Sequence, residues 1–188
     1  RFNNLLPDCL TPIADDYSLI EAAVVECAYA GCDTIWVICN DDISPLVREK
    51  LGDFVEDPVY VYRKFEYSPR ESKRPIPIYY VPIHPKDRSK RDCLPWSVIY
   101  GSLVAFKTSD SLSSWIAPNK YYVSFPYGYF NPKQLREHRK IISSSKNIYL
   151  SYDGETMKDN LFTSFTFGKE EFLDFRRVIR TGTGRHVP

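Results

Sequence analysis

The segment 34–39, which reads Thr-Ile-Trp-Val-Ile-Cys, restricts the fold of this chain more than any other feature. It is a nearly continuous apolar run, rich in β-branched residues and short for a buried helix. Strands that are buried on both faces show this pattern, and they belong to mainly parallel sheets that helices cover on both sides. The run therefore predicts a parallel sheet inside an α/β domain.

A helix over Leu19–Ala30 is expected directly before this strand. Ser18 is a suitable N-cap, and Glu21 follows three residues later, as in a capping box. Gly31 then provides the left-handed residue on which many helices end. These signals predict both ends of the helix.

The remaining pattern repeats this alternation. Further strands are expected at 59–63, 76–83, 121–125, 148–152 and 162–167, and further helices at 45–51, 94–106, 132–142 and 169–179. Such alternation indicates βαβ units, and 188 residues are enough for one domain with its own core. We therefore expect a single three-layer α/β/α domain over 1–180 with a mainly parallel central sheet, and a flexible tail over 181–188.

Charge and cysteine usage exclude several classes of protein. The 25 Lys and Arg against 24 Asp and Glu leave a net charge of +1, so there is no global field for nucleic acid or an anionic membrane. No run of about 18 apolar residues predicts a membrane span. The five cysteines form no CxxC pair, which argues against zinc and favours a reducing compartment, the cytoplasm.

Four motifs follow one another along the chain. Residues 1–16 read RFNNLLPDCLTPIADD, 91–97 read RDCLPWS, 122–128 read YVSFPYG and 165–172 read FTFGKEEF. In order and spacing they resemble the motifs of the sugar-phosphate nucleotidyltransferase family, which has the nucleotide-diphospho-sugar transferase type of fold. The resemblance covers most of the chain.

The resemblance implies a reaction and a set of site residues. A sugar phosphate would attack the α-phosphorus of a nucleoside triphosphate, with Mg²⁺ as cofactor and pyrophosphate as the leaving group. Arg1 matches the arginine that ends the family's glycine-rich loop and would be the catalytic phosphate contact. The base-binding segment would include Asp92, Leu94, Pro95, Trp96 and Ser97, and the pocket floor Ser124, Pro126, Tyr127 and Gly128.

A basic loop precedes the base-binding segment. Lys86, Arg88 and Arg91 are placed to assist at the phosphates, although a solvated charged loop would have the same composition. We expect Arg1→Ala to abolish turnover if the chain is active.

Three positions depart from the family. Asp8 stands where the family has its catalytic lysine, and a carboxylate there would repel phosphates. Asp15 and Asp16 replace the Gly-Lys of the following turn. Tyr127 occupies the position of the magnesium aspartate and cannot supply a carboxylate. Asp153 could replace that metal ligand, or it could be an ordinary turn residue.

These departures leave three functions open. The chain is a nucleotidyltransferase-like protein, or a degenerate relative that acts as an interaction module in a homo- or hetero-oligomer, including a viral particle, or a glycosyltransferase of the same fold type. Aromatic residues make up 15% of the chain, which is typical of a tyrosine-rich sheet or of a subunit interface. We rank the glycosyltransferase last because no Asp-x-Asp motif follows a predicted strand.

Overall fold

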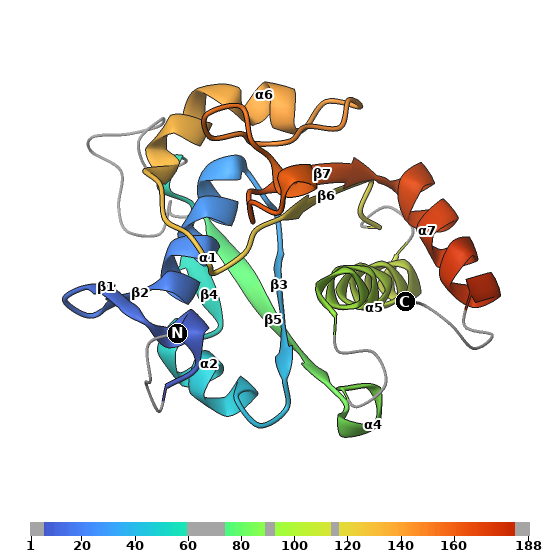
Figure 1. The fold of residues 1–188 in the computed structure, drawn as a ribbon, viewed down its shortest axis with the longest axis horizontal. Coiled ribbons are helices and arrows are strands. Elements are labelled where there is room, and N and C mark those ends of the chain that lie inside the picture. The colour runs from blue at the N-terminus through green and yellow to red at the C-terminus, as the bar shows by residue number, and fades with distance from the viewer. Residues whose placement is uncertain (1–5, 60–73, 89–92, 114–116, 183–188) are drawn as a thin grey trace.

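The computed structural model describes residues 6–59, 74–88, 93–113 and 117–182, and it has a mixed α/β fold, as predicted (Figure 1). The strands are β1 Pro12–Ala14, β2 Tyr17–Ser18, β3 Ile35–Asn40, β4 Phe54–Glu56, β5 Pro75–Ile83, β6 Lys120–Val123 and β7 Phe165–Gly168. The α-helices are α1 Leu19–Ala30, α2 Ser44–Leu51, α4 Pro85–Arg88, α5 Leu94–Leu112, α6 Arg139–Ile142 and α7 Lys169–Gly182. Short 3₁₀ helices cover Asp8–Leu10, Pro132–His138 and Met157–Asp159.

The strands of the described residues form three small sheets. In the largest, β3 runs parallel to β5, from the pair Ile35–Ile78 to the pair Asn40–Ile83. Strand β4 joins the other edge of β5 in the antiparallel direction. Strands β6 and β7 form an antiparallel pair, and β1 and β2 form a small hairpin. The predicted parallel pairing is thus present between β3 and β5.

Helices lie on both faces of the β3–β5 pair. Ile35 and Val37 share one hydrophobic core with Ala28 of α1. On the opposite face Gly101 of α5 lies so close to Ile38 that a Cβ added there would be 2.5 Å from the isoleucine side chain. Figure 1 shows the same arrangement, with α1 and α2 on one side of the two strands and α5 on the other.

The β6–β7 pair has its own aromatic core. The Tyr121 and Phe167 rings stack with centroids 4.9 Å apart, and Phe172 of α7 packs at 5.6 Å from Tyr121. Phe172 also contacts Phe106 of α5. Tyr122, the next residue along β6, packs on the opposite side against a cluster with Ala30 at the end of α1. The two faces of β6 therefore contact different helices.

Several predicted elements differ from the structure. The helix expected at 132–142 is a 3₁₀ helix followed by α6. Of the strand expected at 59–63, Val59 is helical and the rest lies outside the described residues. Helix α7 extends through Gly182, so the start of the expected tail is helical, and 183–188 are not described. Among the described residues, no helix has both the length and the apolar character needed to cross a membrane.

The segment 148–152, which was expected to be a strand, makes only isolated bridges to Phe165 and Glu155. The ladder is interrupted because the Ile148 amide donates to the Thr166 hydroxyl at 2.9 Å rather than to a carbonyl. The chain then turns tightly at Asp153 and Gly154, which both have positive φ angles. The prediction of a regular strand here was therefore wrong.

Candidate functional site

The carboxyl ends of β3 and β5 lie together at one edge of their sheet. Asn40 and Ile83 are paired in register, so the turn after β3 and helix α4 after β5 leave the sheet from the same edge. Ligands of open α/β sheets bind beyond this edge. The predicted nucleotide site is therefore expected at this edge.

Two residues of the predicted nucleotide-binding set lie in the element that directly follows this edge. Lys86 and Arg88, which were expected in a loop, belong to the short helix α4 directly after β5. Leu94, Pro95, Trp96 and Ser97 form the first turn of α5, with proline at a position that needs no amide donor. Arg1, Arg91 and Asp92 lie outside the described residues.

The four residues of the predicted pocket floor follow β6 instead. Ser124 turns inward, Pro126 is half-buried, and Tyr127 and Gly128 are exposed. The Tyr127 ring packs on Phe162, with centroids 5.2 Å apart. The base-binding segment thus belongs to the helix that covers β3, whereas the pocket floor belongs to the β6–β7 sheet.

The acidic positions that replace family residues are all at the surface. Asp8 begins the first 3₁₀ helix, and Asp15 and Asp16 form the turn between β1 and β2. Asp153 is exposed in the 152–155 turn. No group of three or more His, Cys, Asp or Glu side chains within the described ranges is arranged to hold a metal ion. Asp153 as a metal ligand stays a prediction.

A buried carboxylate that the sequence reasoning did not select lies beside the pocket floor. Glu26 of α1 is only 7% exposed. The hydroxyl of Tyr122 donates to its Oε1 at 2.6 Å, and the hydroxyl of Ser124 donates to its Oε2 at 2.8 Å. The Ser164 hydroxyl, just before β7, also donates to Oε1. The available signal was an acidic residue beyond the first turn of α1, inside its Ala- and Val-rich sequence.

The surroundings of Glu26 change the ionisation of the cluster. Burial raises the pKa of Glu26, and the hydrogen bonds from Ser164, Tyr122 and Ser124 oppose this rise. The pKa of Tyr122 is raised by burial and by the neighbouring carboxylate. Strongly shifted groups are common at functional sites, and they also occur in purely structural networks. Geometry must therefore decide between the two.

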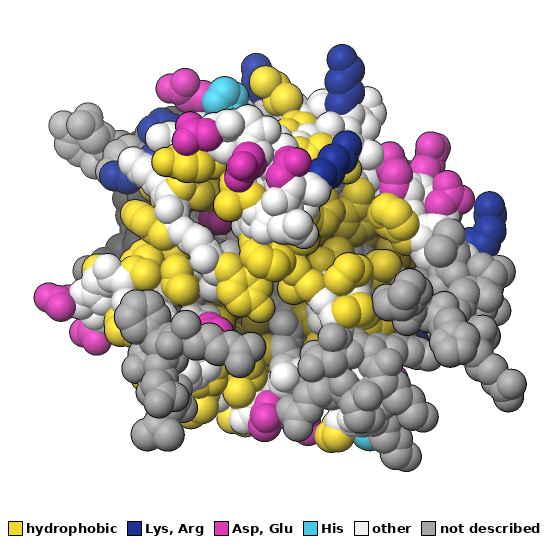
Figure 2. Space-filling view, in the orientation of Figure 1, with side chains coloured by type: hydrophobic (Ala, Val, Ile, Leu, Met, Phe, Trp, Pro, Cys, Tyr) yellow, Lys and Arg dark blue, Asp and Glu magenta, His cyan; other side chains and the backbone are white. Residues whose placement is uncertain are grey.

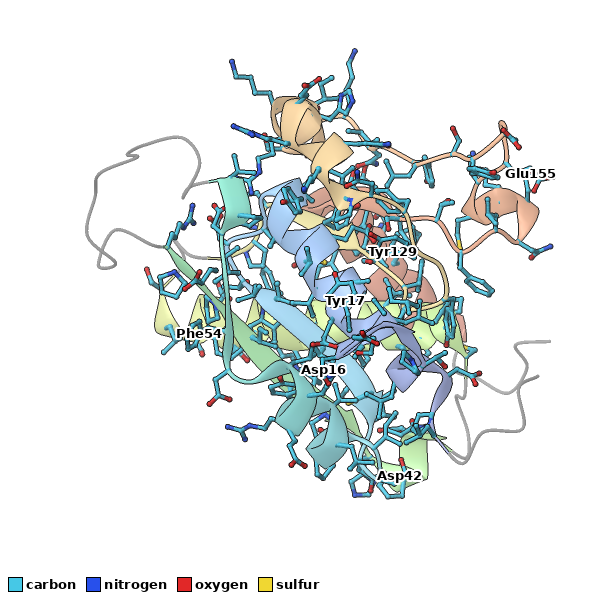
Figure 3. All side chains as sticks on the ribbon, turned by 90° about the vertical axis from the view of Figure 1, so that its left-hand side faces the viewer. Asp16, Tyr17, Asp42, Phe54, Tyr129 and Glu155 are labelled. Carbon is cyan, nitrogen blue, oxygen red and sulfur yellow. The ribbon has the colours of Figure 1, made fainter. Side chains whose placement is uncertain are left out.

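The loop after β6 crosses α1. Its first residue, Ser124, is bound to Glu26 in the middle of the helix. Burial raises the pKa of Tyr17, which directly precedes the helix cap, and Tyr129 farther along the loop raises it further. Figure 3 shows Tyr129 and Tyr17 one above the other, with Asp16 below. The loop is therefore bonded to α1 at Glu26 and then runs toward β2, which precedes the helix.

The loop carries three exposed aromatic side chains, Tyr127, Tyr129 and Phe130, and the exposed Phe162 packs against Tyr127. Figure 2 shows apolar side chains across the centre of the face on which the loop crosses α1. Contiguous apolar surface of this kind marks ligand grooves and protein interfaces.

No family model, no curated protein and no solved structure matches this chain.

Proposed function

We propose that this chain is a nucleotidyltransferase-like protein that binds a nucleoside triphosphate with Mg²⁺ at the carboxyl edge of β3 and β5. The observation that carries the proposal is the parallel pairing of these strands, which brings the turn after β3 and helix α4 to one edge. The helices on both faces agree with a three-layer α/β/α domain, in which ligands bind at this edge.

The proposed roles follow from position. The first turn of α5, at Leu94 to Ser97, receives the nucleotide, because the N-terminal end of a helix attracts anions and Trp96 supplies an aromatic surface. Lys86, Arg88, Arg91 and Arg1 neutralise phosphate charge. The proposed reaction transfers the nucleotidyl group to a sugar phosphate and releases pyrophosphate, with catalysis by positioning and charge neutralisation.

Calorimetric titration with ATP, CTP, GTP and UTP, with and without Mg²⁺, tests the binding. Saturable micromolar binding of one triphosphate is the expected result. Release of pyrophosphate on addition of sugar phosphates then tests the transfer. Binding without release would make the chain a degenerate relative, and an absence of binding in a folded sample would refute the nucleotide site.

A charge placed at the start of α5 tests the location. Ser97→Asp adds a carboxylate in the first turn, where it suits the helix dipole and should leave the fold intact. It should weaken triphosphate binding by about tenfold, because like charges at about 4 Å repel by ~1 kcal/mol or more. Thr108→Asp adds the same charge in an exposed position toward the other end of the helix. Equal affinities for the two variants would place the nucleotide elsewhere.

A second function is favoured by the exposed aromatic residues around the 124–130 loop. Tyr and Phe are enriched in protein interfaces, and Tyr127 and Tyr129 are 53% and 60% exposed. An interaction module would form a stable complex with a partner or with itself. Sedimentation of the purified chain at several concentrations separates a self-associating protein from a monomer.

A further inference from the structure

We propose that Glu26 is a positioning residue for the loop 124–130, which it fixes at the point where the chain leaves β6. The link from this loop to nucleotide binding rests on the function proposed above. The fixing of the loop itself does not, because it follows from the hydrogen bonds around Glu26.

Three hydroxyl groups, from β6, from the residue after it and from the residue before β7, converge on this one carboxylate. Tyr122 and Ser164 donate to Oε1, and Ser124 donates to Oε2. They are 96 to 138 residues away from Glu26 in the sequence, so the contacts are tertiary rather than local. The carboxylate therefore joins the middle of α1 to the end of β6 and the start of β7.

The position of Ser124 explains why this contact controls the loop. Strand β6 ends at Val123, and Ser124 is the next residue. Its backbone is no longer part of the β6–β7 ladder, so the Glu26 bond continues to hold the chain where strand pairing stops. Pro126 follows two residues later, and its ring restricts its φ angle. The Ser124 contact therefore also limits where Tyr127 and Gly128 can lie.

Hydrophobic packing alone does not explain why a carboxylate with three hydroxyl donors is buried here. A buried carboxylate loses its hydration, and apolar side chains of similar volume stabilise a core at least as well. Hydrogen bonds to a charged acceptor are directional and stronger than neutral ones, so they specify one geometry. The raised pKa of Glu26 agrees with a carboxylate that has been placed in a costly position.

Amide hydrogen exchange of the complete chain, without nucleotide, tests the positioning. We expect Glu26→Ala and Ser124→Ala to lower the protection of residues 125–131 by about tenfold, the effect of losing one hydrogen bond to a charged group. Ser164→Ala is the matched control, because it removes one hydroxyl from the same carboxylate but leaves the bond to Ser124. It should disturb the start of β7 and spare the loop.

Glu26→Gln keeps the shape of the side chain and one carbonyl acceptor, so it should restore most of the protection that Glu26→Ala loses. Unchanged protection of 125–131 in both Glu26→Ala and Ser124→Ala would overturn the proposal. Equal loss in Ser164→Ala and Ser124→Ala would also overturn it, because the carboxylate would then stabilise the region as a whole.

Titration with the same four nucleoside triphosphates connects the loop to the site. If the wild type binds one of them, Ser124→Ala should weaken it by about fivefold or more, and Ser164→Ala should not. If the wild type binds none while the exchange pattern is as expected, the proposed function fails and the positioning role stands. If binding is present and equal in both variants, the loop does not serve the nucleotide site.

Discussion

At the scale of single residues, Glu26 shows what a sequence reading can overlook. Inside α1 it stands among Ala, Val and Cys, and its nearest hydrogen-bond partners lie about a hundred residues away. No local pattern predicts such partners, because they depend on how β6 and β7 cross the helix. By contrast, the bonds from Ser18 to Glu21 lie within one turn, and the capping box predicted them.

The ionisation of Glu26 should make stability depend on pH. Burial raises its pKa in the folded protein above the ordinary value of 4.5, so the folded state binds the proton more tightly than the unfolded state. Below 4.5 both states are protonated and the group has no effect on the free energy of unfolding. As the pH rises from there through the folded pKa, wild-type stability should fall relative to Glu26→Gln.

Urea denaturation of the two proteins at a series of pH values measures this difference. Glu26→Gln cannot ionise and lacks this contribution. A constant difference between the two proteins across the series would mean that Glu26 has the same pKa in both states.

At the scale of elements, the sequence predicted those helix ends and strands that depend on neighbouring residues. Helix α1 ends at Gly31, whose φ is 97°, as the glycine predicted, and β3 lies within one residue of the expected apolar run. Strand β4 has three residues and depends on its pairing with β5, so no pattern in 54–56 could reveal it. The candidate site residues followed the same rule: the helix that begins at Leu94 was predicted, whereas helix α4, expected to be a loop, and the Glu26 cluster were not.

The contact between α5 and β3 depends on the absence of a side chain at Gly101. A Cβ there would lie 2.5 Å from both Cδ1 and Cγ1 of Ile38. Gly101→Ala should therefore lower the free energy of unfolding, because overpacking costs about 1–3 kcal/mol and the better helix propensity of Ala returns at most ~1 kcal/mol.

Ile38→Ala removes the atoms that would clash and provides the second arm of a double-mutant cycle. The double variant should be less destabilised than the sum of the single variants, by about 1 kcal/mol or more. Additive effects within about 0.5 kcal/mol would show that α5 shifts to accommodate the methyl group.

At the scale of the whole molecule, long-range polar contacts join parts that have separate cores. The β3–β5 pair and helix α6 each pack in their own hydrophobic cluster. Arg139 of α6 reaches the end of α1, where its Nε donates to the Tyr29 carbonyl at 2.8 Å. It also donates to Asp57, which follows β4, at 2.8 Å. One guanidinium therefore connects three distant segments.

Removal of this guanidinium should cost far more than removal of an exposed one. The Asp57 side chain is 4% exposed, so Arg139→Met breaks a buried charge pair, which costs about 3–5 kcal/mol. Arg48→Met is the matched control, since its guanidinium also makes two bonds to a carboxylate, Asp53, but both side chains are more than 60% exposed. Its cost should be about 0–1 kcal/mol.

Urea denaturation of the two variants at neutral pH compares these costs directly. Arg139→Lys should cost less than Arg139→Met but should still be less stable than the wild type, because its ammonium keeps a charge beside Asp57 and cannot reach the Tyr29 carbonyl and both Asp57 oxygens at once. If Arg139→Met lowered the free energy of unfolding no more than Arg48→Met, the polar contact would add little to stability. The packing of Leu135 and Ile142 at the end of α1 would then account for the contact between these segments. A large cost for Arg139→Met together with a small one for Arg139→Lys would assign the effect to charge rather than to the geometry of the guanidinium.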